Sequence, residues 1–118
     1  MTQKTQSKEI FVETDLTDFK NMDAFEQFKT NIGVKSKQIK ETKFKTKYEM
    51  TLEDNTTVTL GHVPKESKFE GSNNVQAGHI HIKSNDMGKV LQIKKELYKQ
   101  TSYRKGEDYD GWFHELSA

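Results

Sequence analysis

The chain has 118 residues, which suits one domain of ordinary size and is short for two. It has no cysteine, which excludes disulfide bonds, thiolate metal sites and cysteine nucleophiles, and only 31% of its residues are hydrophobic, with no apolar run long enough to span a membrane. The 19 basic and 18 acidic residues leave a net charge of +1, which argues against binding driven mainly by attraction to phosphate.

The distribution of polar and charged residues sets expectations for location and partners. Residues 1–8 are polar, are predicted to be disordered and lack the apolar stretch of a secretory signal, so we expect a cytoplasmic protein. Residues 31–50 hold six lysines against two acids, residues 83–105 hold seven basic residues against two acids, and the last thirteen residues hold four acids. Such blocks point to a charged partner, although solvated lysines on an ordinary surface also explain them.

The first third of the chain predicts a strand followed by a helix. Residues 9–14 (EIFVET) are short and apolar, which is typical of a strand. Asp15 or Thr17 can cap the next helix, and Gly33 can end it in the left-handed conformation. Residues 35–40 then read as a basic connector. The helix is predicted from apolar residues spaced by three and four: Leu16, Phe19, Met22, Phe25, Phe28 and Ile32.

The clearest pattern is a hairpin in the middle of the chain. Apolar and polar residues alternate strictly from Lys43 to Leu52, and again from residue 56 to residue 63, which predicts two half-buried strands. A loop of three residues, 53–55, places Met50 opposite Val58 and so keeps each face of the hairpin uniform. Asn55 would take the left-handed conformation that such a loop needs.

The last third predicts a third strand, a second helix and a tail. After a polar loop over 64–74, residues 75–83 read as a strand with Ile80 and Ile82 on one face. Ser84 can cap a helix that runs to about residue 102. Residues 104–118 form an acidic tail, in which Trp112 either closes the edge of the core or anchors a partner. The apolar stripe of the second helix is Met87, Val90, Leu91, Leu97, Tyr98 and Thr101.

The order β-α-β-β-β-α plus a short C-terminal tail predicts a single α+β domain over residues 1–118. We expect an antiparallel sheet of three to four strands, with both helices packed on one face. The opposite face would then be polar and open, and it is the candidate binding surface, although an antiparallel sheet also exposes such a face without any function. Its predicted binding residues are Lys43, Lys45, Lys47, Thr57, Thr59, His79, His81 and Lys83.

The sequence favours a protein without chemistry of its own. It contains neither a phosphate-binding glycine loop nor a serine nucleophile elbow, so we assign no catalytic residue and no cofactor. The resulting hypothesis is a protein-binding module, an inhibitor or adaptor. Small chains rich in lysine, asparagine and threonine are frequent among accessory proteins of phages and mobile elements, so the preferred target is a host nucleic-acid-handling enzyme.

Two alternatives stay open. The predicted run α-β-β-β-α over residues 16–102 is similar in order to double-stranded RNA-binding domains, which implies a nucleic-acid partner, although Asp86 stands where those domains place lysines. His79 and His81 lie two apart on a predicted strand and are weak candidates for metal ligands of an enzyme. The order of residues 9–83 is similar to one module of the vicinal-oxygen-chelate proteins, which need two modules. The sequence does not predict an oligomeric state.

Overall fold

The computed structural model describes residues 9–41, 43, 46–64 and 74–101, together with the backbone of residues 113–115. Predictions about residues 1–8, Lys45, the loop over 65–73, Trp112 and the other side chains of the tail lie outside this set. In chain order the elements are β1 (Ile10–Thr14), β2 (Thr17–Phe19), α1 (Met22–Ile32), β3 (Val34–Glu41), β4 (Thr46–Leu52), β5 (Thr57–Leu60), β6 (Val75–Gly78), β7 (Ile80–Ser84), α2 (Met87–Gln100) and β8 (Phe113–Glu115).

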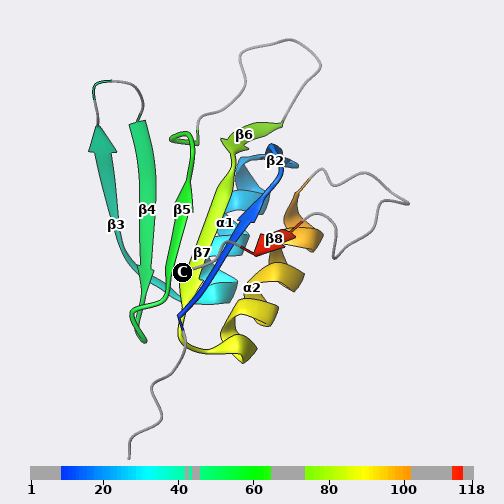
Figure 1. Cartoon of the computed structure of the whole chain (residues 1–118). Coiled ribbons are helices and arrows are strands. Elements are labelled where there is room, and N and C mark those ends of the chain that lie inside the picture. The colour runs from blue at the N-terminus through cyan, green and yellow to red at the C-terminus, as the bar shows by residue number, and fades with distance from the viewer. Residues whose placement is uncertain (1–8, 42, 44–45, 65–73, 102–112, 116–118) are drawn as a thin grey trace, which may run out of the picture.

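The predicted α+β architecture is confirmed, with two helices on one side of an antiparallel sheet (Figure 1). The predicted strand number of three to four is wrong. The described residues form a six-stranded sheet in the order β3-β4-β5-β7-β1-β8, and β2 pairs separately with β6. The extra strands lie mainly at the edges, where β3 has no apolar alternation because nearly all of it is exposed. In sequence, four strands of the main sheet lie between α1 and α2, where three were predicted. They are β3, β4, β5 and β7.

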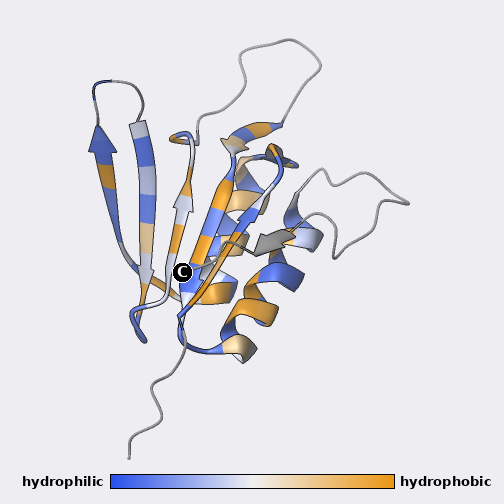
Figure 2. Cartoon of the chain, viewed as in Figure 1, coloured by the Kyte–Doolittle hydropathy of each residue, from blue (hydrophilic) through white to orange (hydrophobic). Residues whose placement is uncertain are grey.

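The core lies between the sheet and the helices. Figure 2 shows apolar residues alternating with polar ones along β4, β5 and β7, as period-two burial requires. From the sheet the core takes Val12, Tyr48, Met50, Leu52, Val58, Leu60, Ile80 and Ile82, and from the helices it takes Phe25, Phe28, Ile32, Val90, Ile93 and Leu97.

The predicted hairpin is confirmed in its register and its loop. Met50 lies opposite Val58, and Tyr48 lies opposite Leu60. The backbone N–H of Leu52 donates to the carbonyl of Thr56 at 2.9 Å and so closes the loop over residues 53–55. Asn55 has a φ of 67°, the left-handed conformation expected of it. Alternating hydrophobicity was enough to predict this register, because a shift of the strand pairing by one residue would expose the core side chains to solvent.

The start of α1 differs from the prediction. The helix begins at Met22, and the side chain of Asn21 caps it by accepting the N–H of Ala24 at 2.7 Å, so neither Asp15 nor Thr17 is the cap. Leu16 is 72% exposed, whereas Phe19 is buried as part of β2. The three-residue spacing of Leu16 and Phe19 fitted a helix by coincidence. The predicted stop at Gly33 is confirmed, with a φ of 78°.

The buried face of α2 also differs from the predicted stripe. Val90, Ile93 and Leu97 are fully buried, whereas Met87, Leu91 and Tyr98 are between 43% and 50% exposed. Each residue of a helix is rotated by about 100° from the one before it, and the predicted set combined residues from two neighbouring faces of α2. Neither α1 nor α2, the helices of the described residues, has both the length and the apolar character needed to cross a membrane.

The ends of α2 depend on polar contacts that the sequence pattern placed differently. Asp86, not Ser84, caps the helix and accepts the N–H of Gly88 at 2.8 Å. The Ser84 hydroxyl is instead buried and shares a 2.8 Å hydrogen bond with the hydroxyl of Thr56. The helix ends at Gln100, close to the expected end.

The predicted third strand is broken into two. Residues 75–78 form β6 and pair with β2, whereas residues 80–84 form β7 and pair with β5 and β1. The break falls at Gly78, which has a φ of 72°, and a Cβ atom there would lie only 2.9 Å from the His62 ring. Gly78 therefore allows both the turn and the close contact with His62.

Candidate functional site

The face of the sheet that points away from the helices is the surface predicted from the sequence. Residues directly opposite each other on antiparallel strands point to the same side, so the strand registers define this face. Neither described helix covers it. We call it the outward face, and its described residues are Phe11 and Glu13 on β1, Ser36, Gln38 and Lys40 on β3, Lys47, Glu49 and Thr51 on β4, Thr57 and Thr59 on β5, and His81 and Lys83 on β7.

Two rows of side chains cross the outward face at right angles to the strands. One row contains Gln38, Glu49, Thr59, His81 and Glu13, each opposite the next. The other row contains Ser36, Thr51, Thr57, Lys83 and Phe11 in the same order of strands. The hydroxyl-bearing threonines therefore lie in the middle of the sheet, and the charged and aromatic groups flank them.

Contacts between β1 and β7 give the outward face an aromatic and ionic cluster. The Nε2 atom of His81 lies 2.7 Å from a carboxylate oxygen of Glu13. The His81 ring also packs on Phe11, with 5.5 Å between the ring centres. Lys83 lies 5.8 Å from the centre of the same Phe11 ring, on which a cation is favourable. Each of these four side chains is held by a neighbour, so the cluster is ordered before any partner binds.

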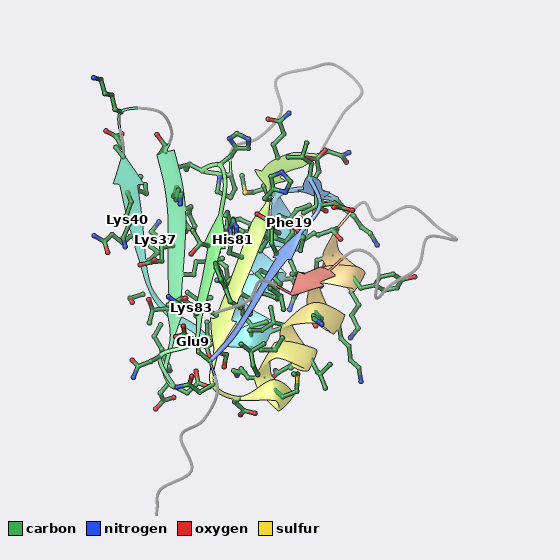
Figure 3. All side chains as sticks on the ribbon, viewed as in Figure 1. Glu9, Phe19, Lys37, Lys40, His81 and Lys83 are labelled. Atoms are coloured by element: carbon green, nitrogen blue, oxygen red, sulfur yellow. The ribbon has the colours of Figure 1, made fainter. Side chains whose placement is uncertain are left out.

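Charges on the outward face are largely balanced within the face. Lys83 lies 3.9 Å from Glu9, the residue just before β1 (Figure 3). Lys40 lies 3.3 Å from Glu49. Three lysines therefore stand against two glutamates of the face and Glu9 beside it. Opposite charges placed so close cancel at a distance, which makes this face a poor attractor of a phosphate backbone. It can still accept and donate hydrogen bonds at short range.

Most of the predicted binding residues lie together, and some do not. Lys47, Thr57, Thr59, His81 and Lys83 all belong to the outward face. Lys43 is exposed but stands outside the strands, and Lys45 is outside the described residues. His79 is exposed in the break between β6 and β7, where its Nδ1 atom lies 2.8 Å from the carbonyl oxygen of Thr14.

The two histidines make different contacts. His81 pairs with a carboxylate of β1, whereas His79 meets a backbone carbonyl at the end of β1. Within the part of the chain that the structure describes, no group of three histidine, aspartate or glutamate side chains is close enough to hold a metal ion. Among the described residues, no such group forms around His79 or His81 to support the metal-enzyme alternative.

Sequence reasoning missed two contributions to this face. Phe11 was read only as one of three apolar residues in a strand, and its side follows from the pairing of β1 with β7, which are about seventy residues apart in the chain. Ser36, Gln38 and Lys40 were assigned to a connector. One local pattern indicates that this segment is a strand: polar residues at 36, 38 and 40 alternate with Lys37 and Ile39. The pattern is weak because Lys37 is itself polar.

Comparison of the chain with models of protein families, with curated proteins and with solved structures found no match. The function is therefore argued from the geometry of the described surfaces.

Proposed function

We propose that this chain is a protein-binding module without chemistry of its own, and that it binds its partner through the outward face. The observation that supports this proposal is the ordered cluster of Phe11, His81 and Lys83 beside a row of threonines. Aromatic side chains held in place lose little entropy on binding, and hydroxyl groups adapt to a partner's hydrogen bonds. A face of this kind suits a protein surface better than a phosphate backbone.

Within this class we propose an inhibitor or adaptor that acts in the cytoplasm, from a phage or mobile element, on a host nucleic-acid-handling enzyme. The support for that finer statement is compositional alone. The paired charges add one physical point: charges of both signs on one face set the orientation of a partner more than they add affinity.

The test uses two variants that change the net charge equally. Lys47→Glu with Lys83→Glu alters the outward face, and Lys20→Glu with Lys95→Glu alters exposed residues elsewhere. Proteins captured from a host lysate by the unaltered chain are identified, and the strongest is purified and titrated against all three chains. We expect the outward-face variant to lose at least about tenfold in affinity and the control variant to keep it.

Equal affinity of the two variants would remove the outward face from consideration. Thermal unfolding of both variants checks that each is folded. All four lysines are exposed or half-buried, so we expect no substitution to change stability by more than about 1 kcal/mol, with the largest change for Lys83, which loses its ion pair with Glu9.

The nucleic-acid alternative has one observation in its favour, which lies on α2. That helix carries Lys89, Lys94, Lys95 and Lys99 against Glu96, a net charge of +3. Elution from heparin separates the two proposals. If phosphate binding is the function, Lys95→Glu should lower the salt concentration of elution, whereas Lys47→Glu should do so only if the outward face contacts phosphate as well.

A further inference from the structure

Strand β3 differs from the other strands of the sheet in its exposure. Seven of its eight residues are exposed, and the first, Val34, is intermediate. It stands at the end of the sheet order, so no strand of the described residues pairs with its outer edge. Figure 1 shows β3 at the left of the sheet, beyond the helices. Its outer N–H and C=O groups are therefore available to an added strand.

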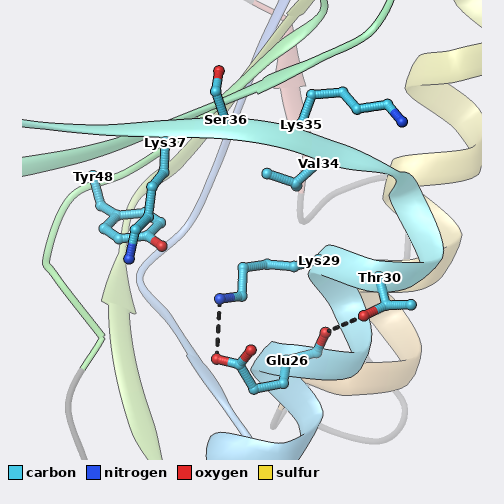
Figure 4. A pocket seen from close by; sticks show the side chains of 8 residues that line it. All are labelled: Glu26, Lys29, Thr30, Val34, Lys35, Ser36, Lys37 and Tyr48. Carbon is cyan, nitrogen blue, oxygen red and sulfur yellow. Dashed lines mark hydrogen bonds and ion pairs between the residues drawn. The ribbon is translucent and has the colours of Figure 1, made fainter.

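A pocket opens beside the first half of β3, on the helix side of the sheet. It has a volume of about 290 Å³ and lies between the last turns of α1 and the start of β3 (Figure 4). Glu26, Lys29 and Thr30 of α1 form one wall, Lys35 and Lys37 of β3 form the other, and Tyr48 of β4 contributes its ring. This volume is at the lower limit of roughly 300–1,000 Å³ for small-molecule sites, so it suits one or two side chains better than a nucleotide.

The pocket carries an excess of positive charge. Three lysines line it against one glutamate, a net charge of +2. Lys29 is only 22% exposed and lies 3.0 Å from Glu26 and 4.7 Å from the centre of the Phe25 ring. Lys37 lies 5.7 Å from the centre of the Tyr48 ring, and Tyr48 is almost fully buried. Lys29 is partly withdrawn from bulk water and therefore attracts a carboxylate more strongly than a fully solvated lysine does, and the exposed Lys37 adds a second positive charge to the lining.

Two of the three lysines already have an acid of the same chain beside them: Glu26 lies 3.0 Å from Lys29, and Glu53 lies 4.0 Å from Lys35. Lys37 has no ion pair with another of the described residues, so its charge is the one left for a partner. Of the four acids in the last thirteen residues only Glu115 belongs to the described residues, and its strand β8 pairs with β1 at the opposite edge of the sheet. A second copy is also a poor match, because β3 carries three lysines and one glutamate, and self-pairing would place like charges together. The complementary partner is an extended acidic segment of another protein.

We propose that β3 is a docking edge on which an acidic segment of a partner protein adds as a further strand and places a carboxylate in the pocket between Lys29 and Lys37. Side chains of an added strand alternate between its two faces, so every second residue would point towards the pocket side. The backbone provides affinity without sequence preference, and the lysines select acidic residues. This inference rests on the proposed protein-binding function but uses a different surface, so the two can fail separately.

The probe is a fluorescent peptide of about eight residues in which glutamate alternates with valine and threonine. Fluorescence polarisation measures its binding to the full chain at low salt. We expect saturable binding with a Kd below about 1 mM. Lys37→Glu and Lys29→Gln should each weaken the affinity at least about tenfold, and the matched control Lys95→Glu should leave it unchanged. A peptide with lysine in place of glutamate should not bind.

Strand addition is tested separately from charge. Two further peptides carry N-methyl groups on every second amide, so that one peptide is blocked along one edge of its strand and the other peptide along the opposite edge. A methylated amide cannot donate a hydrogen bond to β3. At least one of them should lose binding, and the unmodified peptide should shift the amide resonances of β3. Binding that survives both methylations, binding that Lys37→Glu leaves unchanged, or no saturable binding would each overturn the proposal. If the peptide fails while Lys47→Glu with Lys83→Glu still releases the captured partner, the outward-face function stands alone.

Discussion

Asp54 shows how a single side chain makes the turn between β4 and β5 depend on pH. Its carboxylate accepts the backbone N–H of Thr56 at 3.1 Å. Hydrogen bonding by the Thr56 side chain is the main cause that lowers the pKa of Asp54 below 3.8, against a smaller opposing effect of burial. A carboxyl with a lowered pKa in the folded state stabilises that state in its charged form.

The sign of the effect fixes the pH window. The contribution of Asp54 is complete above its unfolded pKa of about 4 and is lost as the pH falls through the lower folded pKa. We therefore expect the difference in free energy of unfolding between the unaltered chain and Asp54→Asn to stay constant above about pH 5 and to narrow as the pH falls below the unfolded pKa of about 4. Urea unfolding at several pH values measures it, and a difference that stays constant below that pKa as well would contradict the assignment.

Glu96 shows what a sequence conceals at the scale of one residue. It lies on a lysine-rich helix and would be expected to point into solvent, yet it is only 9% exposed. Its carboxylate accepts hydrogen bonds from the Asn31 side chain at 2.8 Å and from the Gln100 side chain at 3.0 Å, and so joins α2 to α1. The partner in α1 is 65 residues away, and no local pattern marks that pair.

At the scale of elements, predictability follows the strength of the local pattern. The register and the loop of the hairpin of β4 and β5 were predicted correctly because one face is buried and one is not. The strand predicted over residues 56–63 is shorter in the structure, where β5 runs from Thr57 to Leu60. The strand β3 was missed because it is exposed on both sides and its residues have no reason to alternate. The body of α1 was predicted correctly, but its start was not. The stretch before Asn21 is short, and its apolar residues Leu16 and Phe19 have a helical spacing of three although the buried residues of the strand β2, Thr17 and Phe19, are spaced by two.

The correction of the α2 face gives a direct test. Ile93 is fully buried, whereas Leu91, two residues earlier, is 47% exposed. Ile93→Ala should lower the free energy of unfolding by about 2–5 kcal/mol, because it leaves a cavity between the helix and the sheet. Leu91→Ala removes a similar volume at the surface and should change it by no more than about 0.5 kcal/mol. Chemical denaturation of the two variants measures the contrast, and equal losses would mean that the helix is rotated.

At the scale of the whole molecule, the candidate surface was predicted only where strand neighbours are close in the sequence. Alternation assigned Lys47, Thr57 and Thr59 to the outward face correctly. The aromatic cluster needs β1 beside β7, and the docking edge needs β3 at the end of the sheet. Both depend on long-range pairing, which the period of one strand does not encode.

The sheet order also predicts where the molecule is most and least stable. The strands β5 and β7 have partners on both sides, and their inward side chains Val58, Leu60, Ile80 and Ile82 are fully buried. The strand β3 has one partner and is exposed on both faces. Local opening needs the least free energy where few buried contacts are lost, so β3 should open without the rest of the sheet.

Amide hydrogen exchange of the free protein, followed by NMR, tests this order. We expect the slowest exchange in β5 and β7, at the rate of global unfolding, and much faster exchange in β3, with the amides on its outer edge fastest of all. The opposite result, with β3 as protected as β5 in a dilute sample, would mean that another segment covers its edge in solution. An occupied edge could not receive an acidic strand, so slow exchange there would remove both the proposed docking and the exposure on which it rests.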